Sequence, residues 1–447
     1  MNYDESVRAL MALGRELAAP RQSRLESFGL NTIAVLAKDL GDPQLAAPCA
    51  HIAGTNGKGS TAAMLESILR IAGLRTGLYT SPHLERINER IRVNGADISD
   101  EAFASAWTRV QDSIESLMAS GKLAAHPTFF ECITAIAFLT FATHDVDFAV
   151  YEVGLGGRFD ATNIVQPEVA VITPIDFDHE NFLGHSIQEI AGEKAGIIKR
   201  GAWIVSSVER PEARAVIAKK SNELDARLVE VDSAWRVEDV ESTDGYYRAM
   251  ARGVNSQKAL ALKPALPGRF QIRNALTAAT AARLLAQRGF AISDEAIEGG
   301  IATVRWPGRL ERLSEKPAVY LDGAHNPAGA KELSRFWDEN FVSRRIILVY
   351  GAMRDKAVDE IAGVLFPRAD TVILTEPCQP RAISVSLLSE MAGHLAKHVL
   401  VVRDPSEALE RALAMASPED AVFVTGSLYL VGELRAYWKS ASHRAVE

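Results

Sequence analysis

The sequence predicts an α/β protein with a large N-terminal domain and a smaller C-terminal domain, each built on a mostly parallel sheet. Apolar, β-branched runs alternate along the chain with stretches of helical periodicity, and the runs stop abruptly at glycine or at polar clusters. Continuous apolar strands that alternate with helices are typical of a parallel sheet covered on both faces. The 447 residues are about three times the usual size of one domain, so at least two domains are expected.

Six apolar runs are the predicted strands. They lie at 149–157, 169–179, 318–327, 345–353, 371–377 and 421–427. Predicted helices include 60–73, 128–144 and 271–289. In parallel sheets, ligands bind beyond the carboxyl ends of the strands. The polar clusters of this sequence fall at those ends, which favours an enzyme.

The alternation of strand and helix is interrupted near the middle of the chain. Residues 238–270 are rich in polar residues and turn formers, which predicts a short antiparallel excursion. Residues 305–313 predict a bent connector, after which the alternation restarts at Val319. We therefore expect an N-terminal domain over 1–302 and a C-terminal domain over 303–447.

Composition limits the classes of partner. Lys and Arg number 49 against 57 Asp and Glu, a net charge of −8, so little positive charge is available for nucleic acid or an anionic membrane. The N-terminus lacks the pattern of a signal peptide, and no apolar run reaches the roughly 20 residues that span a bilayer. The three cysteines are far apart and odd in number, which argues against disulfides or structural zinc. We expect a cytoplasmic protein.

The segment HIAGTNGKGST (51–61) comes directly before an amphipathic helix. Its glycines let backbone N–H groups surround phosphate oxygens, and the helix N-terminus adds favourable partial charge. We therefore expect a P-loop-type N-terminal domain that binds the phosphates of a nucleotide. The predicted contacts are Gly54, Thr55, Asn56, Gly57, Lys58, Gly59, Ser60 and Thr61. The spacing departs from the common G-x-x-x-x-G-K-[ST] pattern, and a strand–helix turn without a ligand is the alternative.

Further segments match one family in the same order along the chain. They are TSPHLERINERIRVNG (80–95), TFFE (128–131), EVGLGGRFDATN (152–163), DHENFLGHSIQEIAGEKAGIIK (178–199), NALTA (274–278), PGR (307–309) and DGAHNP (322–327). With G-T-N-G-K-G-[ST], this series resembles the folylpolyglutamate synthase and dihydrofolate synthase family of the Mur-ligase superfamily. The resemblance implies a Rossmann-like C-terminal domain and an ATP-dependent ligase that adds L-glutamate to reduced folates and to dihydropteroate.

The chemistry of such a ligase explains the residue types. ATP activates a carboxylate as an acyl phosphate, and the anionic intermediates require Mg²⁺ with oxygen-rich ligands. The resemblance implies that Ser81, Glu152 and His179 are the Mg²⁺ ligands. Ser81 could instead be a turn residue and His179 a hydrogen-bonded residue at a strand end. Glu152 could be a buried paired carboxylate, although burying a charge without a cation is costly.

Lys194 lies in EKAGIIK. The resemblance implies that CO₂ carbamylates this lysine, which converts a cation into a carboxylate-like group near the magnesium site. Without the family, Lys194 would be interpreted as an exposed charge on a helix.

The resemblance also implies contacts at the domain junction. Asn274, Arg309 and Asp322 are expected to bind the nucleotide, and Arg309 could bridge phosphate oxygens with its forked donors. A surface salt bridge is the alternative for Arg309. His325 and Ser427 follow predicted strands and could position the incoming glutamate, or they could be helix caps.

Two segments are candidates for a pterin pocket. The residues are Thr128, Phe129, Phe130, Phe159, Asp160 and Ala161. The two phenylalanines of the first segment could form an aromatic platform, or both could be core residues of a helix. Because both kinds of enzyme in the family can carry such segments, a synthase that acts only on folates is the alternative to a bifunctional one.

Other functions fit the sequence less well. A cell-wall Mur ligase needs a substantial N-terminal domain for its nucleotide-sugar substrate, and only 53 residues precede Gly54. A non-enzymatic nucleotide-binding switch would need the phosphate loop but neither Glu152 nor His179. The expected partners are therefore dihydropteroate, reduced folates and L-glutamate, bound by a monomer.

Overall fold

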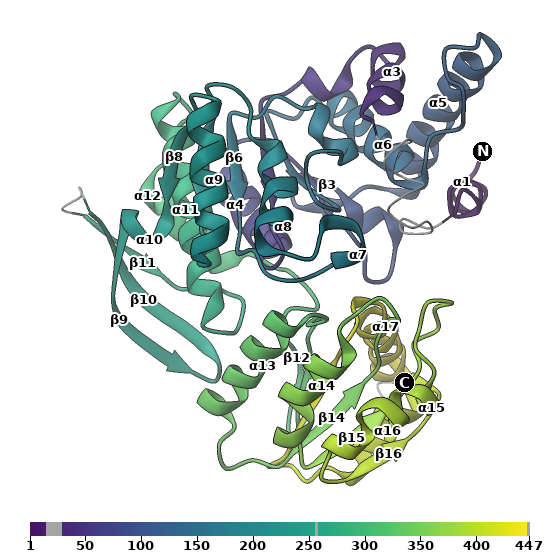
Figure 1. The fold of residues 1–447 in the computed structure, drawn as a ribbon, viewed down its shortest axis with the longest axis vertical. Helices are drawn as coiled ribbons and strands as arrows, with labels where there is room; N and C mark the ends of the chain where they lie inside the picture. The colour runs from purple at the N-terminus through teal and green to yellow at the C-terminus, as the bar shows by residue number, and fades with distance from the viewer. Residues whose placement is uncertain (15–28, 255–257, 445–447) are drawn as a thin grey trace.

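The computed structural model describes residues 1–14, 29–254 and 258–444, which form three sheets (Figure 1). The largest has eight strands in the order β4-β3-β2-β5-β1-β6-β7-β8. The strands are β1 (Cys49–Ala53), β2 (Thr76–Tyr79), β3 (Ile91–Val93), β4 (Ala96–Asp97), β5 (Phe148–Glu152), β6 (Val169–Ile172), β7 (Trp203–Ser206) and β8 (Arg227–Glu230). All neighbours from β2 to β8 pair in parallel, whereas β3 and β4 form an antiparallel edge that the strand pattern did not predict.

Helices cover both faces of this sheet because its strands are apolar on both sides. The first face packs against α4 (Lys58–Ile71), α11 (Phe270–Gln287) and α12 (Asp294–Thr303). The opposite face packs against α1 (Tyr3–Ala12), α3 (Asn31–Asp39), α5 (Asp100–Ala119), α6 (Phe129–Thr143), α8 (Ile187–Lys194) and α9 (Pro211–Glu223). Two further short helices are α7 (Glu180–Leu183) and α10 (Val231–Ala234).

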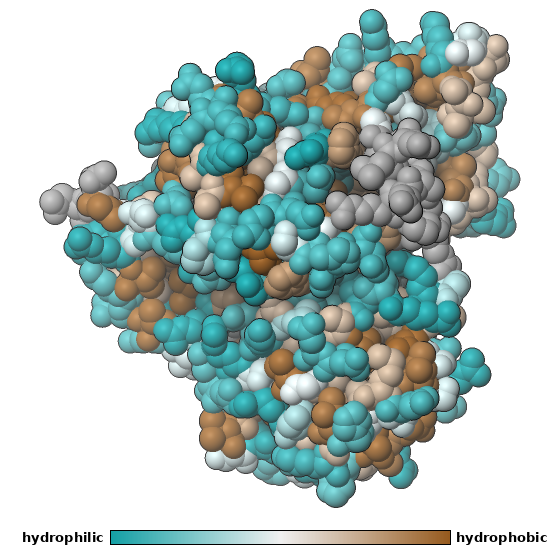
Figure 2. All heavy atoms as spheres, viewed as in Figure 1, coloured by the Kyte–Doolittle hydropathy of each residue, from teal (hydrophilic) through white to brown (hydrophobic). Residues whose placement is uncertain are grey.

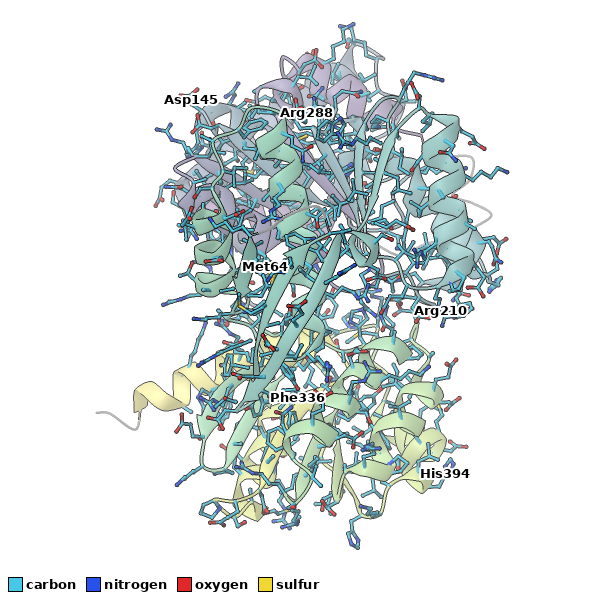
Figure 3. All side chains as sticks on the ribbon, turned by 90° about the vertical axis from the view of Figure 1, so that its left-hand side faces the viewer. Met64, Asp145, Arg210, Arg288, Phe336 and His394 are labelled. Atoms are coloured by element: carbon cyan, nitrogen blue, oxygen red, sulfur yellow. The ribbon has the colours of Figure 1, made fainter. Side chains whose placement is uncertain are left out.

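The predicted antiparallel excursion is a three-stranded sheet in the order β11-β10-β9. Its strands are β9 (Trp235–Thr243), β10 (Tyr246–Gly253) and β11 (Ala259–Leu262). Figure 3 shows this sheet extending from the N-terminal unit to the C-terminal one, where Phe336 lies. The turn at Gly245 packs against the Phe336 ring, so the small sheet touches both units.

The third sheet has the order β12-β13-β17-β14-β15-β16 and is parallel except for β12. Its strands are β12 (Glu311–Glu315), β13 (Ala318–Leu321), β14 (Ile346–Tyr350), β15 (Thr371–Leu374), β16 (Val399–Val401) and β17 (Ala421–Thr425). One face packs against α13 (Pro327–Asn340), α14 (Val358–Leu365) and α15 (Val385–Ala392), and the other against α16 (Pro405–Met415) and α17 (Leu428–Arg444). The predicted two-part α/β architecture is confirmed.

The chain passes from the first unit to the second between α12 and β12. The predicted division at 302/303 falls at the end of α12 and stays a prediction. The predicted connector over 305–313 is shorter in the structure, because β12 begins at Glu311 and pairs with β13.

The surface is mostly hydrophilic on the face in Figure 2, where hydrophobic side chains form scattered patches. Within the described part of the chain, every helix is too short or too polar to cross a bilayer.

Candidate active site

A cavity of about 800 Å³ lies where loops of the N-terminal unit face the C-terminal unit. Its lining includes the predicted nucleotide-contact residues, with the exception of Thr61, together with Ser81, Glu152, His179, Lys194 and His325. The structure therefore brings together side chains that the sequence scatters over most of its length. Their individual roles stay predictions.

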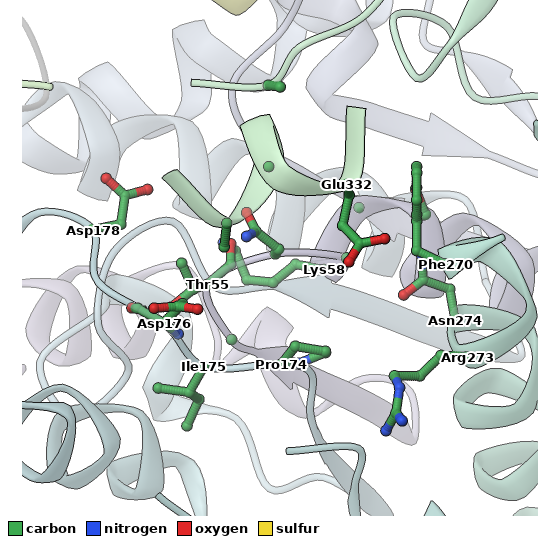
Figure 4. A pocket seen from close by; sticks show the side chains of 18 of the residues that line it. Thr55, Lys58, Pro174, Ile175, Asp176, Asp178, Phe270, Arg273, Asn274 and Glu332 are labelled. Atoms are coloured by element: carbon green, nitrogen blue, oxygen red, sulfur yellow. Dashed lines mark hydrogen bonds between the residues drawn. The ribbon is translucent and has the colours of Figure 1, made fainter. Parts of the chain in front are cut away.

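The phosphate loop connects β1 to α4. Gly57 stands before the first residue of α4 with φ 83°, a left-handed conformation that favours glycine. A Cβ at this position would lie 2.5 Å from Asn274 Oδ1, so the loop also needs glycine because α11 approaches it closely. Figure 4 shows Lys58 and Asn274 beside the same space. The loop thus presents the N-terminus of a 14-residue helix to the cavity.

Lys58 is the first residue of α4, and its Nζ donates to Thr55 O at 3.1 Å. Burial lowers the pKa of Lys58, whereas the negative charges of Glu152 and Asp178 act in the opposite direction. The two carboxylates therefore oppose the loss of positive charge beside the helix N-terminus, a charge that suits a polyphosphate.

Glu152 ends β5 and is only 4% exposed. One of its oxygens accepts a hydrogen bond from Ser81 N at 3.2 Å. Burial raises the pKa of Glu152, and Lys58 opposes this shift. A carboxylate at this depth would be stabilised by a nearby cation.

His179 lies just before α7 in a left-handed conformation, with φ 52°. Its buried Nδ1 has no hydrogen-bond partner among the described residues, and its Nε2 lies 3.3 Å from Lys356 Nζ. Burial, and then the charge of Lys356, lower the pKa of His179 to about 3. The imidazole is therefore neutral at physiological pH and offers a lone pair.

Asp178 connects the two units. One oxygen accepts from Lys356 Nζ at 2.7 Å, and the other accepts from Asn326 Nδ2 at 3.2 Å and lies 3.5 Å from His325 Nε2. Burial alone would raise the pKa of Asp178, but His325 and Lys356 hold it well below its usual range. Asp178 is thus a fixed negative charge among groups of the C-terminal unit.

Asn56 and Asn326 form a second link between the units. Asn326 Nδ2 donates to Asn56 Oδ1 at 2.9 Å, and Asn56 Nδ2 donates to Asn326 Oδ1 at 3.2 Å. Asn326 also caps α13 by accepting from Gly329 N at 2.8 Å. The phosphate loop is therefore joined directly to the N-terminus of a helix in the other unit.

Lys194 ends α8 and is 4% exposed, so the alternative of an exposed helix charge is wrong. Its Nζ donates to Gly54 O at 2.8 Å. Burial and then the charge of Lys58 lower its pKa to about 7. A substantial fraction of the amine is therefore neutral near physiological pH.

The linker holds Arg309 at the cavity. Arg309 Nη1 donates to Gly308 O at 3.2 Å, and the guanidinium packs against Gly323. Both oxygens of Asp322 accept backbone N–H groups at 2.9 Å, from Leu310 and from Ala324. Burial raises the pKa of Asp322, and Arg309 opposes this shift.

Two predicted contacts lie outside the cavity lining. Thr61 is fully buried in α4, and its Oγ1 has no hydrogen-bond partner among the described residues. Ser427 is 2% exposed, and its Oγ accepts from Tyr429 N at 3.1 Å at the start of α17. This contact agrees with the alternative of a helix cap for Ser427.

The predicted pterin residues also lie outside the cavity lining. Thr128 caps α6 in a reciprocal pair with Glu131, and the ring of Phe129 is buried with Arg90 5.3 Å from its centroid. Phe130 is half-buried, and its ring packs on Gly154. Phe129 therefore belongs to the core, and it does not form an aromatic platform together with Phe130.

The second pterin segment is held by its own hydrogen bonds. The Asp160 oxygens accept from Leu155 N and Thr162 N at 2.9 and 3.0 Å, and burial raises the pKa of Asp160 to about 6. Ala161 is buried, whereas Phe159 is 42% exposed. Of the six residues, Phe130 and Phe159 keep the accessible rings that could contact a pterin, and that role stays a prediction.

Sequence reasoning missed Asp178, Lys356 and Asn326. Asp178 and Asn326 lie inside segments that matched the family, next to residues that were singled out. Lys356 lies in a polar cluster after the strand β14, the same signal that identified other candidates. Every polar cluster that follows a predicted strand is therefore a candidate segment of the site.

Family models match both units. A model described as the Mur ligase middle domain matches residues 52–282, and one described as the Mur ligase, glutamate ligase domain matches residues 308–428. The chain belongs to the Mur ligase family. The family predicted from the sequence is confirmed, and this Mur ligase is an ATP-dependent amide-bond-forming enzyme.

Known relatives match this Mur ligase over most of its length. It is 38% identical over 410 residues to the dihydrofolate synthase/folylpolyglutamate synthase of Bacillus subtilis, covering 91% of this chain and 94% of the relative. It is 33% identical over 412 residues to the Escherichia coli protein of the same name, covering 92% of each chain.

Solved structures show the same fold. A Mycobacterium tuberculosis folylpolyglutamate synthase complexed with ADP and AMPPCP matches with a TM-score of 0.87 at 33% identity, over 97% of this chain and 99% of that one. The Escherichia coli FolC in complex with DHPP and ADP matches with a TM-score of 0.84 at 30% identity, over 99% of each chain.

Proposed function

We propose that this Mur ligase joins L-glutamate to reduced folates and to dihydropteroate, with ATP as the energy source. The observation that carries the proposal is the cavity, in which the phosphate loop and Glu152 face His325 of the other unit, while Lys356 of that unit is bound to Asp178 in the cavity lining. A carboxylate activated on one side can therefore meet an amine held on the other. The names of the Bacillus subtilis and Escherichia coli relatives support both activities.

The reaction has two steps. A carboxylate oxygen of the folate or pteroate attacks the γ-phosphorus of ATP, which forms an acyl phosphate and releases ADP. The neutral amine of glutamate then attacks the acyl carbon to give a tetrahedral intermediate. This intermediate expels inorganic phosphate, and the amine loses a proton as the amide forms. Held in one cavity, both reactants gain from proximity and orientation.

The phosphates of ATP lie against the loop in this proposal. Backbone N–H groups at the start of α4 and the ammonium of Lys58 balance their charge. Asn274 contacts the nucleotide beside the loop. Its Oδ1 lies 2.5 Å from the position that a Cβ on Gly57 would occupy. Arg309 and Asp322 contact the nucleotide from the linker and the C-terminal unit.

Magnesium fits the residues at the cavity. Glu152 and Ser81 offer oxygen ligands, and the neutral imidazole of His179 offers one nitrogen lone pair. Mg²⁺ commonly takes only one or two carboxylates and completes its shell with phosphates and water. Among the described residues, no group of three or more His, Cys, Asp or Glu side chains is arranged to hold a metal ion by itself. When bound, the ion would neutralise charge on the phosphoryl oxygens.

Lys194 is carbamylated in our proposal. Its lowered pKa of about 7 leaves neutral amine, the form that reacts with CO₂, and its Nζ lies against the phosphate loop at Gly54 O. The product would carry negative charge beside Lys58 and close to the metal ligands.

Lys356 and His325 are the groups we assign to the incoming glutamate. Asp178 holds Lys356 at 2.7 Å and lies 3.5 Å from His325, so two polar groups of the C-terminal unit meet at one carboxylate of the cavity lining. Donors of this kind suit the carboxylates of an amino acid. Ser427 stays a candidate contact for the glutamate.

Activity on folates alone is the second candidate. A relative from Lacticaseibacillus casei, 35% identical over 437 residues, is named only folylpolyglutamate synthase. The test offers dihydropteroate and tetrahydrofolate separately with ATP, Mg²⁺ and glutamate. If both acceptors support a glutamate-dependent release of ADP, the enzyme is bifunctional. If only tetrahydrofolate supports it, the second candidate is correct.

A monomeric, cytoplasmic enzyme stays our expectation. Sedimentation of the purified protein and fractionation of cells test these two statements.

A further inference from the structure

The loop between β2 and β3 docks on the last helix of the other unit. Leu84 O lies so close to α17 that any side chain at position 432 would overlap it, and Gly432 occupies that position. Figure 1 shows α17 on the side of the C-terminal unit that faces the N-terminal unit. Backbone therefore contacts backbone across the junction, on a loop that contains Ser81.

Arg435 lies one turn further along α17 and joins two carboxylates. Its Nη1 donates to Glu85 in the loop, and its Nε donates to both oxygens of Glu311 at 2.9 Å. The side chains of Arg435, Glu85 and Glu311 are 16%, 17% and 22% exposed. A planar guanidinium has enough donors to serve both partners at once, and such half-buried pairs are screened less than surface ones.

The carboxylates of Glu85 and Glu311 are each connected to a segment that lines the cavity. Glu311 also accepts from Gly308 N at 2.9 Å, the residue immediately before Arg309 in the linker. Glu85 belongs to the loop whose Ser81 N donates to Glu152 at 3.2 Å. Arg435 itself does not line the cavity. One side chain thus connects the two segments that carry Ser81 and Arg309.

We propose that Arg435 is a positioning residue for ligation, which holds the Ser81 loop and the Arg309 linker in register so that both reach the same nucleotide. This inference rests on the proposed function, because that function assigns Ser81 and Arg309 to ATP and its metal ion. Lys439 of α17 also donates to Glu85, at 2.8 Å, whereas Arg435 contacts both Glu85 and Glu311. The arrangement explains why an arginine rather than a lysine bridges them, since a lysine is a single point charge.

The test compares Arg435→Met, Arg435→Lys, Glu85→Gln and the double variant Glu85→Gln/Arg435→Met in the full-length protein. Arg435→Met should lower kcat about tenfold, the loss typical of a charge-assisted hydrogen bond, and should raise the KM for ATP while leaving the KM for glutamate unchanged. A fraction of unfolded protein would change neither KM. Arg435→Lys should recover part of kcat. The losses in the double variant should combine to less than their product, because both changes break the Arg435–Glu85 contact, although Glu85→Gln also weakens the pair with Lys439.

Arg403→Met is the matched control, since Arg403 is 80% exposed and pairs with Glu376 inside the C-terminal unit. Its kcat should stay within about twofold of wild type. An Arg435→Met enzyme with wild-type kcat and KM for ATP would overturn the inference, as would independent, multiplicative losses in the double variant. If the wild-type protein fails to ligate glutamate, the proposed function itself fails, which is a different outcome.

Discussion

Lys356 Nζ donates to Asp178 Oδ1 at 2.7 Å and joins the loop after β14 to the loop after β6. Both side chains are 9% exposed, so each charge depends on the other for compensation. The same ammonium lies 3.3 Å from His179 Nε2. A cation of the C-terminal unit is therefore held beside residues that we assign to the metal ion and the phosphates.

Lys356→Met should impair the use of glutamate. The variant keeps the length of the side chain but loses the ammonium, so we expect kcat/KM for glutamate to fall about tenfold to a hundredfold, as for a hydrogen bond to a charged group. Steady-state kinetics with varied glutamate measure this effect. Lys397→Met is the control, because Lys397 is 53% exposed and pairs with Asp370 at the surface. An unchanged KM for glutamate together with an unchanged kcat would show that Lys356 only joins the units.

Lys58→Ala should abolish ligation and leave the fold intact. Lys58 lies half-buried at the start of α4, where its ammonium faces the space for the phosphates. We expect turnover to fall at least about a hundredfold, as on removal of one donor to developing charge. Circular dichroism checks the fold and ADP release measures turnover. Turnover close to that of wild type would remove the assignment of the phosphate loop.

Glu152→Gln should severely reduce activity, and raised Mg²⁺ should recover part of it. The substitution preserves shape and the contact with Ser81 N but removes the negative charge of a 4% exposed side chain. A titration of activity against Mg²⁺ concentration separates metal affinity from other defects. If the Mg²⁺ dependence matches that of wild type and activity is retained, Glu152 is structural.

If Lys194 is carbamylated as we propose, activity should depend on CO₂ and on pH. Its pKa is lowered from an ordinary value of about 10.4 to about 7, so the reactive neutral amine increases as the pH rises through about 7. Removing CO₂ at mildly acidic pH should therefore lower activity, and bicarbonate at higher pH should restore it. Lys194→Ala should be nearly inactive, with partial rescue by a short carboxylate. A bare amine in a high-resolution structure of the active, nucleotide-bound enzyme would contradict the carbamate.

The same shift affects stability. Between about 7 and the ordinary lysine pKa of about 10.4, the unfolded chain binds a proton at Lys194 that the folded chain lacks. The free energy of unfolding should therefore rise with pH across this window. In Lys194→Met that rise should be smaller, which chemical denaturation at several pH values measures.

Strands and phosphate loop were predictable because they depend on local sequence. The apolar runs at 149–157 and 421–427 became β5 and β17, and the glycines of 54–59 lie where β1 turns into α4. The antiparallel edge of β3 and β4 was missed because two short, half-polar strands carry little periodicity.

Contacts between the units could not be predicted from local patterns. Asp178 and Lys356 are 178 residues apart, and nothing in either segment specifies the other. Their contact depends on how two separately folded sheets dock. Phe129 illustrates a second limit of prediction from sequence. Its place on α6 was predicted, but which face of α6 is buried depends on packing against α5.

The most direct test of the central claim is the mass of the product. Purified protein is incubated with tetrahydrofolate or dihydropteroate, ATP, Mg²⁺ and L-glutamate, and the acceptor is analysed by mass spectrometry. We predict that each acceptor gains one glutamyl residue per ATP consumed, and that omission of ATP or glutamate prevents the gain. An unmodified acceptor, with ATP consumed at the same rate whether or not glutamate is present, would contradict the account.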